Sequence, residues 1–202
     1  MPQEKLITGN AIFRNKFKEK EDLYFDLANN GQQPKVLWVG CSDSRVVPEF
    51  IVNAKAGDLF VTRNIANIIP PAEAGESCTS SVLEYAVLHL HVEHIIICGH
   101  TGCGGMNAVI DGTPENSQIH AWLKHACHPK LKVNNSNREE LVLETIKENV
   151  LLQAENLLTF DFVQKRFDQG NLQIHNWLYD MSSGEISYYE KSDHHWHPIS
   201  KL

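Results

Sequence analysis

The stretch VLWVGCSDSRVV, residues 36–47, decides which fold the chain can adopt. Its first half is a continuous apolar run, which is typical of a strand covered on both faces within a parallel sheet. The run stops at Cys41, and Asp43 and Arg45 follow at alternate positions. Residues i, i+2 and i+4 of an extended chain point to the same side, so these three side chains would share one side if the strand geometry persists.

Similar apolar runs recur along the chain and alternate with segments of helical spacing. The predicted strands are 35–40, 57–63, 94–100, 171–180 and 184–190. The predicted helical segments are 7–34, 77–93 and 138–170, the last one broken near Thr159. Such alternation predicts an α/β fold with a mainly parallel central sheet flanked by helices. A short connection joins the final two strands like a hairpin, so the last strand is expected to be antiparallel.

Composition narrows the class of protein further. The chain has 202 residues, 42% of them hydrophobic and 21% charged, which suits one globular domain. Its formal charge of −7 argues against a nucleic-acid partner, since such partners select a basic face. No apolar run approaches the roughly 18 residues that a membrane span needs. The first ten residues lack the layout of a signal peptide, so we predict a cytoplasmic location.

The cysteines suggest a metal site rather than disulfides. Their number is odd, five, and without an export signal they are expected to be reduced. His100 and Cys103 are spaced i, i+3, which places two side chains on one face if a helix begins there. Thiolates and imidazole are preferred zinc ligands, and a Cys2His set leaves a fourth position open. Cys41 is the natural third ligand, because the carboxyl ends of parallel strands form one edge.

The pattern alone leaves other readings open. A cysteine after a strand is often a small packed hydrophobe, and residues 42–44 could simply form a turn or a helix cap. If a metal is present, Asp43 could be a fourth ligand or could accept a hydrogen bond from metal-bound water. Arg45 is expected to pair with Asp43 and to keep that carboxylate ionised.

The motifs CSDSRV and HTGCGG, with GDLFVTRNIAN between them, resemble the β-class carbonic anhydrases over about Gln32 to Tyr179. The resemblance implies one Zn²⁺ per subunit, with Cys41, His100 and Cys103 as its ligands. It implies that Asp43 and Arg45 form a catalytic dyad. The implied reaction is the reversible hydration of CO2 to bicarbonate and a proton, by attack of zinc-bound hydroxide on CO2.

The family also implies a substrate pocket and an assembly. The implied substrate-binding residues are Gln32, Phe60, Tyr85 and Gly104, although plain core packing stays open for the two aromatic residues. Residues 1–33 would form an N-terminal helical arm that packs on a partner subunit, and residues 34–202 the zinc-binding α/β core of a single domain. The expected assembly is a homodimer or homotetramer.

Three further residues match a regulated subset of the family. Trp38, Arg63 and Tyr179 correspond to a non-catalytic bicarbonate pocket. The resemblance suggests that bicarbonate or low pH releases Asp43 from Arg45 and places it on zinc, which stops the reaction. Alternatively, Trp38 is an ordinary strand residue, Arg63 forms a surface or interface ion pair, and Tyr179 belongs to the core.

Two other functions are compatible with the same motifs. The same fold could hydrolyse a CO2-like substrate such as carbonyl sulfide or carbon disulfide, or could bind bicarbonate and zinc without catalysis. The presence of Asp43, Arg45 and Gln32 argues against the non-catalytic reading, since a structural zinc site needs no dyad. The run His194–His197 is predicted to be a solvated tail rather than a metal site.

Overall fold

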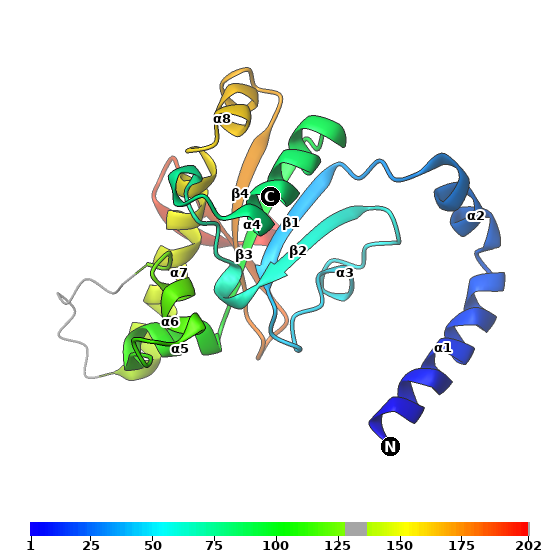
Figure 1. Ribbon diagram of the computed structural model, residues 1–202, viewed down its shortest axis with the longest axis horizontal. Coiled ribbons are helices and arrows are strands. Elements are labelled where there is room, and N and C mark those ends of the chain that lie inside the picture. Colours follow the sequence, from blue (N-terminus) through cyan, green and yellow to red (C-terminus); the bar gives the residue numbers. More distant parts are fainter. Residues whose placement is uncertain (128–136, 202) are drawn as a thin grey trace. The chain divides into compact units, whose positions relative to one another are not determined.

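The computed structural model describes residues 1–127 and 137–201 (Figure 1). Within this part the chain divides into two compact units, Met1–Gln33 and Pro34–Leu202. None of the described helices is both long and apolar enough to cross a bilayer.

The N-terminal unit is a pair of helices, α1 (Pro2–Lys18) and α2 (Glu21–Asn30). Aromatic rings join the two: Phe17 and Tyr24 stack with centroids 4.4 Å apart, and Phe13 meets Tyr24 edge-on at 5.8 Å. Several large apolar side chains of the pair remain exposed, namely Leu6, Ile7, Ile12 and Phe25.

The second unit is built on a six-stranded sheet of order β2-β1-β3-β4-β5-β6. The strands are β1 (Val36–Cys41), β2 (Leu59–Asn64), β3 (His94–His100), β4 (Gln173–Tyr179), β5 (Ile186–Glu190) and β6 (His195–Pro198). The first four in this order are parallel to one another, and β5 and β6 pair antiparallel. The predicted mainly parallel sheet and its antiparallel final hairpin are confirmed.

Short and long helices connect the strands. They are α3 (Pro48–Ile51), α4 (Ser77–Glu84), α5 (Gly104–Asp111), α6 (Gln118–Leu123), α7 (Arg138–Leu157) and α8 (Asp161–Asp168). A π-helical turn, Tyr85–His89, extends α4, and single 3₁₀ turns occur at Ile65–Asn67, Ala72–Ala74 and Ile199–Lys201. The predicted break near Thr159 is the junction of α7 and α8.

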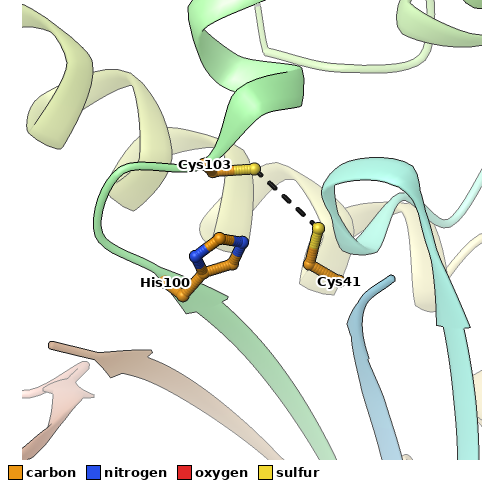
Figure 2. Close-up of side chains that lie close together, drawn as sticks. All are labelled: Cys41, His100 and Cys103. Carbon is orange, nitrogen blue, oxygen red and sulfur yellow. Dashed lines mark hydrogen bonds between the residues drawn. The ribbon is translucent and has the colours of Figure 1, made fainter. Parts of the chain in front are cut away.

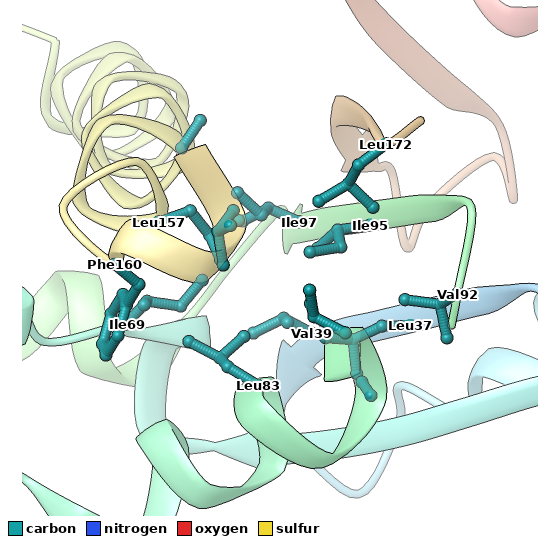
Figure 3. Close-up of a cluster of buried hydrophobic side chains, with 14 of the residues drawn as sticks. Leu37, Val39, Ile69, Leu83, Val92, Ile95, Ile97, Leu157, Phe160 and Leu172 are labelled. Atoms are coloured by element: carbon teal, nitrogen blue, oxygen red, sulfur yellow. The ribbon is translucent and has the colours of Figure 1, made fainter. Parts of the chain in front are cut away.

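The main hydrophobic core lies between one face of the sheet and helices α4, α7 and α8 (Figure 3). Successive strand residues alternate between faces, so Leu37 and Val39 of β1 enter this core while Trp38 points to the other face. There Trp38 packs with Ile96 and Cys98 and is fully buried.

Close approach of α7 to the sheet explains a glycine inside β3. A Cβ on Gly99 would lie 2.7 Å from Cγ2 of Val150 and 3.1 Å from Cγ2 of Ile146, both on α7. The absent side chain therefore lets the helix pack against the strand just before His100.

The prediction of a solvated tail for His194–His197 is wrong. His195–Pro198 forms β6, which extends the sheet beyond β5. Trp196 pairs with Tyr189 and packs against the apolar clusters, which gives this polar run enough buried surface to hold a strand.

Candidate metal centre

Cys41 and His100 are the last residues of two neighbouring parallel strands. The register pairs Gly40 with Cys98, so both strands end at the same edge of the sheet. Cys103 follows three residues after His100, and the three side chains point toward one another (Figure 2). They are 4%, 1% and 1% exposed, and their ligand atoms all lie within 4.8 Å of one another.

A turn, rather than a helix face, brings His100 and Cys103 together. Helix α5 begins only at Gly104, with Cys103 as its N-cap, so the predicted helical spacing is wrong. Gly102 adopts a left-handed conformation with φ of +67°, which glycine reaches without steric cost. The chain reverses there and returns the thiol of Cys103 toward the end of β3.

The tautomer of His100 follows from its surroundings. Nδ1 lies 3.0 Å from the backbone oxygen of Thr101, and since a carbonyl only accepts, Nδ1 carries the proton. Nε2 then presents a lone pair, and this buried atom has no hydrogen-bond partner in the described part of the chain. A buried, unpartnered nitrogen with its other ring N–H fixed by a carbonyl is the arrangement of a metal ligand.

Sequence reasoning missed the support of this turn by the β4–β5 connection. The Thr101 hydroxyl donates to Asp180 Oδ1 at 3.3 Å and accepts from the backbone N–H of Met181 at 3.0 Å. The backbone N–H of Thr101 donates to the oxygen of Tyr179 at 3.0 Å. The link joins residues about 80 positions apart, so only the three-dimensional pairing of β3 with β4 reveals it.

The two thiols behave as one acid–base pair. Their sulfurs are 4.0 Å apart. The contact with Cys103 lowers the pKa of Cys41, assisted by His100 and opposed by burial. The same contact, together with burial, raises the pKa of Cys103. A metal ion binds cysteine as the thiolate, so binding would displace the protons that these two sulfurs carry.

The residues fit a tetrahedral zinc ion. Zn–S bonds of about 2.3 Å would place two ligand sulfurs roughly 3.8 Å apart. The observed 4.0 Å is close to that value. Two sulfurs and one imidazole nitrogen also match the donor preference of zinc, and they leave one position of a tetrahedron without a protein ligand.

Asp43 and Arg45 form a bidentate pair beside the cluster. Arg45 Nε donates to Asp43 Oδ1 at 2.9 Å and Nη2 donates to Oδ2 at 2.6 Å. These bonds, most of all, hold the pKa of Asp43 well below its usual range, and they raise that of Arg45. Oδ2 of Asp43 is 4.0 Å from His100 Nε2. The carboxylate is thus near the cluster but paired with the guanidinium.

Cys41, Asp43 and Arg45 do not lie on one continued strand, so the extended geometry behind their predicted common side does not persist. The strand ends at Cys41, and the backbone turns at once: the N–H of Arg45 donates to Asp43 Oδ1 at 3.0 Å, and that of Val46 to the Asp43 carbonyl at 2.9 Å. An aspartate that closes a turn on its own backbone favours this conformation over a continued strand.

The predicted regulatory residues lie on the face of the sheet that carries Trp38. Trp38 and Tyr179 belong to the same apolar cluster. Arg63 pairs with Gly40 in the register, and a Cβ on Gly40 would lie 2.7 Å from Trp38 Nε1. The indole N–H, buried and unpartnered among the described residues, therefore lies over the glycine opposite Arg63.

Two of the predicted substrate residues, Phe60 and Tyr85, lie away from the cluster of their own chain, whereas Gly104 lies beside it. Phe60 and Tyr85 lie together, with ring centroids 5.8 Å apart. Phe60 pairs with Leu37, four residues before Cys41. Four strand residues span roughly 13 Å. Gly104 begins α5 beside Cys103 with open space where a Cβ would lie, and Gln32 is exposed in the N-terminal unit.

Ala66 and Gly105 pack against each other beside Cys103. Ala66 adopts a left-handed conformation with φ of 64° and is fully buried. A Cβ on Gly105 would lie only 2.8 Å from the Cβ of Ala66. Gly105 therefore lets the start of α5, and with it Cys103, lie against the turn after β2.

Comparison with known proteins agrees with this geometry. Residues 36–186 match the model of the carbonic anhydrase family. A carbonic anhydrase from Synechococcus elongatus is 38% identical over 189 residues, 90% of this chain and 70% of that protein. One from Helicobacter pylori strain J99 is 33% identical over 202 residues, 93% of this chain and 90% of that protein.

Solved structures show the same fold. The β-carbonic anhydrase CcaA superposes with a TM-score of 0.92 at 34% identity, covering 98% of this chain and 100% of that one. A tetrameric β-carbonic anhydrase from Sordaria macrospora gives 0.82 at 30% identity, covering 92% and 95%.

A mainly parallel α/β core with a buried Cys2His group at its carboxyl edge defines an α/β protein with a cluster that could hold a metal ion. With the matches above, the chain belongs to the β-class carbonic anhydrases, an enzyme family of the lyase class.

Replacing one sulfur ligand tests the metal centre. We expect Cys103→Ser to weaken zinc binding by more than the 10- to 100-fold typical of changes around a ligand, because a ligand itself is lost. Competition with a chromophoric chelator measures the affinity. Cys78→Ser, at an exposed cysteine of α4, is the matched control and should keep the parent affinity. Equal affinities in all three proteins would contradict the assignment.

Proposed function

We propose that the protein catalyses the reversible hydration of CO2 to bicarbonate and a proton, with one zinc ion held by Cys41, His100 and Cys103. The observation behind this proposal is the buried Nε2 of His100, which has no hydrogen-bond partner among residues 1–127 and 137–201 and faces two thiols, with an ion-paired aspartate 4.0 Å away. A purely structural site would need the ligands but not the Asp43–Arg45 pair. The pair therefore favours an enzyme over a structural or merely binding zinc protein.

Asp43 is the residue that accepts the hydrogen bond from the attacking oxygen and orients it. Zinc, when bound, supplies a Lewis acid that lowers the pKa of water toward about 7, so that hydroxide forms near neutral pH. The lowered pKa of Asp43 keeps its carboxylate ionised under those conditions, so it accepts a hydrogen bond and orients the attacking oxygen. Arg45 occupies both carboxylate oxygens and so fixes the direction of the remaining lone pairs.

The N-terminus of α5 contributes backbone polarity. Gly104 is the first residue of that helix and has no heavy atom within 4 Å of a would-be Cβ. Its amide N–H is one of the unsatisfied donors that begin every helix, and such donors favour anionic groups. Bicarbonate is the anion that this end of the helix would stabilise.

Stopped-flow CO2 hydration by zinc-loaded protein tests the proposal. We expect Asp43→Ala to lower the rate about 100-fold or more, the usual effect of losing a proton-handling group. Arg45→Ala should lower it less, about tenfold, since the carboxylate remains but is no longer oriented. Asp111→Ala is the control, because Asp111 forms a similar ion pair with Arg138 on the surface.

Two outcomes would overturn this function. Absence of hydration by the parent at alkaline pH would exclude a carbonic anhydrase activity. Turnover of carbonyl sulfide or carbon disulfide in place of CO2 would instead assign the site to hydrolysis of a CO2-like substrate.

We propose that the active protein is a homodimer or a homotetramer. Phe60 and Tyr85 lie away from the cysteines of their own chain, so a role for them in the substrate pocket requires a second copy. The exposed apolar residues of α1 and α2 supply a surface that association would cover.

Sedimentation velocity checks the assembly. The parent is expected at two or four times the chain mass, and Ile7→Glu with Phe25→Glu should shift it toward the monomer, because both charges would be buried on association. Lys5→Glu, on the same helix pair, is the control and should leave the mass unchanged. A monomeric parent at every concentration would contradict the proposal.

Regulation by bicarbonate is supported by the surroundings of Trp38. Its buried N–H and the guanidinium of Arg63 are two donors on the same face, with Tyr179 in the same cluster, and together they suit a small oxyanion. Bicarbonate bound there would favour a state in which Asp43 leaves Arg45 and binds zinc, as would low pH. Such a shift requires that bicarbonate bind that state more tightly.

Bicarbonate dependence of the hydration rate tests this regulation. We expect the parent to lose activity as bicarbonate rises, and Trp38→Phe to need at least about fivefold more bicarbonate for the same loss, within the usual range of coupling. The phenyl ring keeps most of the packing but removes the N–H. Trp196→Phe on β6 is the control. Identical curves for parent and Trp38→Phe would exclude the pocket.

We also propose a cytoplasmic location. Oxidation of Cys41 and Cys103 would remove two zinc ligands, so a reducing compartment favours the function. Fractionation of the source cells would contradict this if the protein were found outside the cytoplasm.

A further inference from the structure

Helix α7 carries a stripe of amide side chains on the face that it buries. Asn149, Gln153 and Asn156 follow one another at intervals of four and three residues, so they lie along one side of the helix. Asn149 is 1% exposed and Gln153 is fully buried. A buried amide is costly unless its donors and acceptors are bonded. This stripe finds its partners in the turn after β2, residues 65–69.

Each amide of the stripe binds the backbone of that turn. Asn149 Nδ2 donates to the oxygen of Ala66 at 3.1 Å. Gln153 Oε1 accepts from the N–H of Ile69 at 2.8 Å. Asn156 Nδ2 donates to the oxygen of Ile69 at 2.9 Å. The turn is therefore attached to α7 at two points, and Asn149 alone binds the first of them.

Two further bonds fix the orientation of the Asn149 amide. Its Oδ1 accepts from Gln153 Nε2 at 3.0 Å and from the backbone N–H of Cys127 at 3.1 Å. Both partners are donors, so this atom is the oxygen, and the NH2 group is left to face the Ala66 oxygen. Asn149 is therefore a donor that is oriented toward the turn in advance.

The turn needs such support because its backbone is strained. Ala66 has φ of 64° and Asn67 has φ of 49°, so two successive non-glycine residues are left-handed. This conformation is unfavourable for a residue with a Cβ and persists where the surrounding structure imposes it. The bond from Asn149 to the Ala66 oxygen is one such constraint.

The strained turn supplies a donor to the candidate metal centre. Ala66 belongs to the same buried cluster as Cys41 and Cys103, and its N–H is one of two backbone donors to the sulfur of Cys41. The backbone N–H groups of Gly105 and Met106 donate to the sulfur of Cys103. Since Ala66 and Gly105 also pack against each other, the turn and the start of α5 form one unit that provides donors to both sulfurs.

We propose that Asn149 is a positioning residue: it holds Ala66 left-handed and so keeps the Ala66 N–H on the sulfur of Cys41. The other two amides of the stripe bind the far end of the same turn. A hydrogen bond to a ligand thiolate draws charge from the sulfur, so this contact tunes how strongly Cys41 donates to a bound metal. The inference rests on the proposed function in that it takes Cys41 as a metal ligand.

Cobalt-substituted protein tests the proposal, because the near-ultraviolet band of a cobalt–thiolate bond reports the charge on its sulfur. Asn149→Ala removes the donor to Ala66. Asn176→Ala is the matched control: Asn176 is 3% exposed, and its amide also donates to one backbone oxygen, that of Val150 at 3.0 Å, which belongs to α7 and not to the turn. Thermal unfolding is measured in parallel, to show that the two variants lose comparable stability.

We expect the parent and Asn176→Ala to share one band position. In Asn149→Ala the band should shift to longer wavelength, since a sulfur with one donor fewer gives up charge more readily. Adding Ala66→Gly to Asn149→Ala should return the band toward the parent position, because glycine adopts a left-handed conformation without steric cost. A residue that only stabilised the fold would not be rescued in this way.

The outcomes separate this inference from the proposed function. An unshifted band in Asn149→Ala, or an equal shift in Asn176→Ala, would overturn the positioning role. If Asn149→Ala does not fold, Asn156→Ala decides, since Asn156 is only half-buried and binds the same turn, and a parent-like band there overturns the role. A parent that does not hydrate CO2, but whose cobalt band shifts as expected in Asn149→Ala, would refute the enzyme function and support the positioning role.

Discussion

Parallel pairing of β1 with β3 is the constraint on which the rest of the site depends. It brings Cys41 and His100, which are 59 positions apart in the sequence, to the same edge of one sheet. Because both strands are buried in the middle of the sheet, their ends have little freedom. A short turn from one of these two strand ends places each remaining component of the site. These components are the thiol of Cys103, the Asp43–Arg45 pair and the start of α5.

Polar backbone contacts then hold the two turns in place. On the β3 side, Thr101 is bound by Asp180 and Met181 of the β4–β5 connection. On the β1 side, Arg63 of β2 binds the carbonyls of Cys41 and Asp43. The neighbouring strands therefore do more than complete the sheet, because each one supplies the bonds that fix a ligand turn.

The sequence allowed most of the strands to be predicted, since apolar runs are strong signals, and two of these runs end abruptly at Cys41 and near His100. The predicted grouping of these two residues with Cys103 is also observed. The prediction failed for elements whose conformation depends on contacts with distant parts of the chain. β6 has few apolar residues, and its strand conformation depends on Trp196 meeting Tyr189. The spacing around Asp43 and Gly102 is compatible with a continued strand, a helix start or a turn, and it does not distinguish among them. The structure has a turn at both places.

Ala66 and Gly105 share the space for a single methyl group beside Cys103. The methyl group now belongs to Ala66, whose left-handed backbone costs a non-glycine residue about 1 kcal/mol or more. An alanine at position 105 would meet the Cβ of Ala66 at 2.8 Å and Cγ2 of Ile65 at 3.1 Å, whereas a glycine at position 66 would remove the first contact and relieve the backbone cost. Substitution here therefore has an order, because glycine is tolerated at position 66 by itself but alanine at position 105 is expected only after that change.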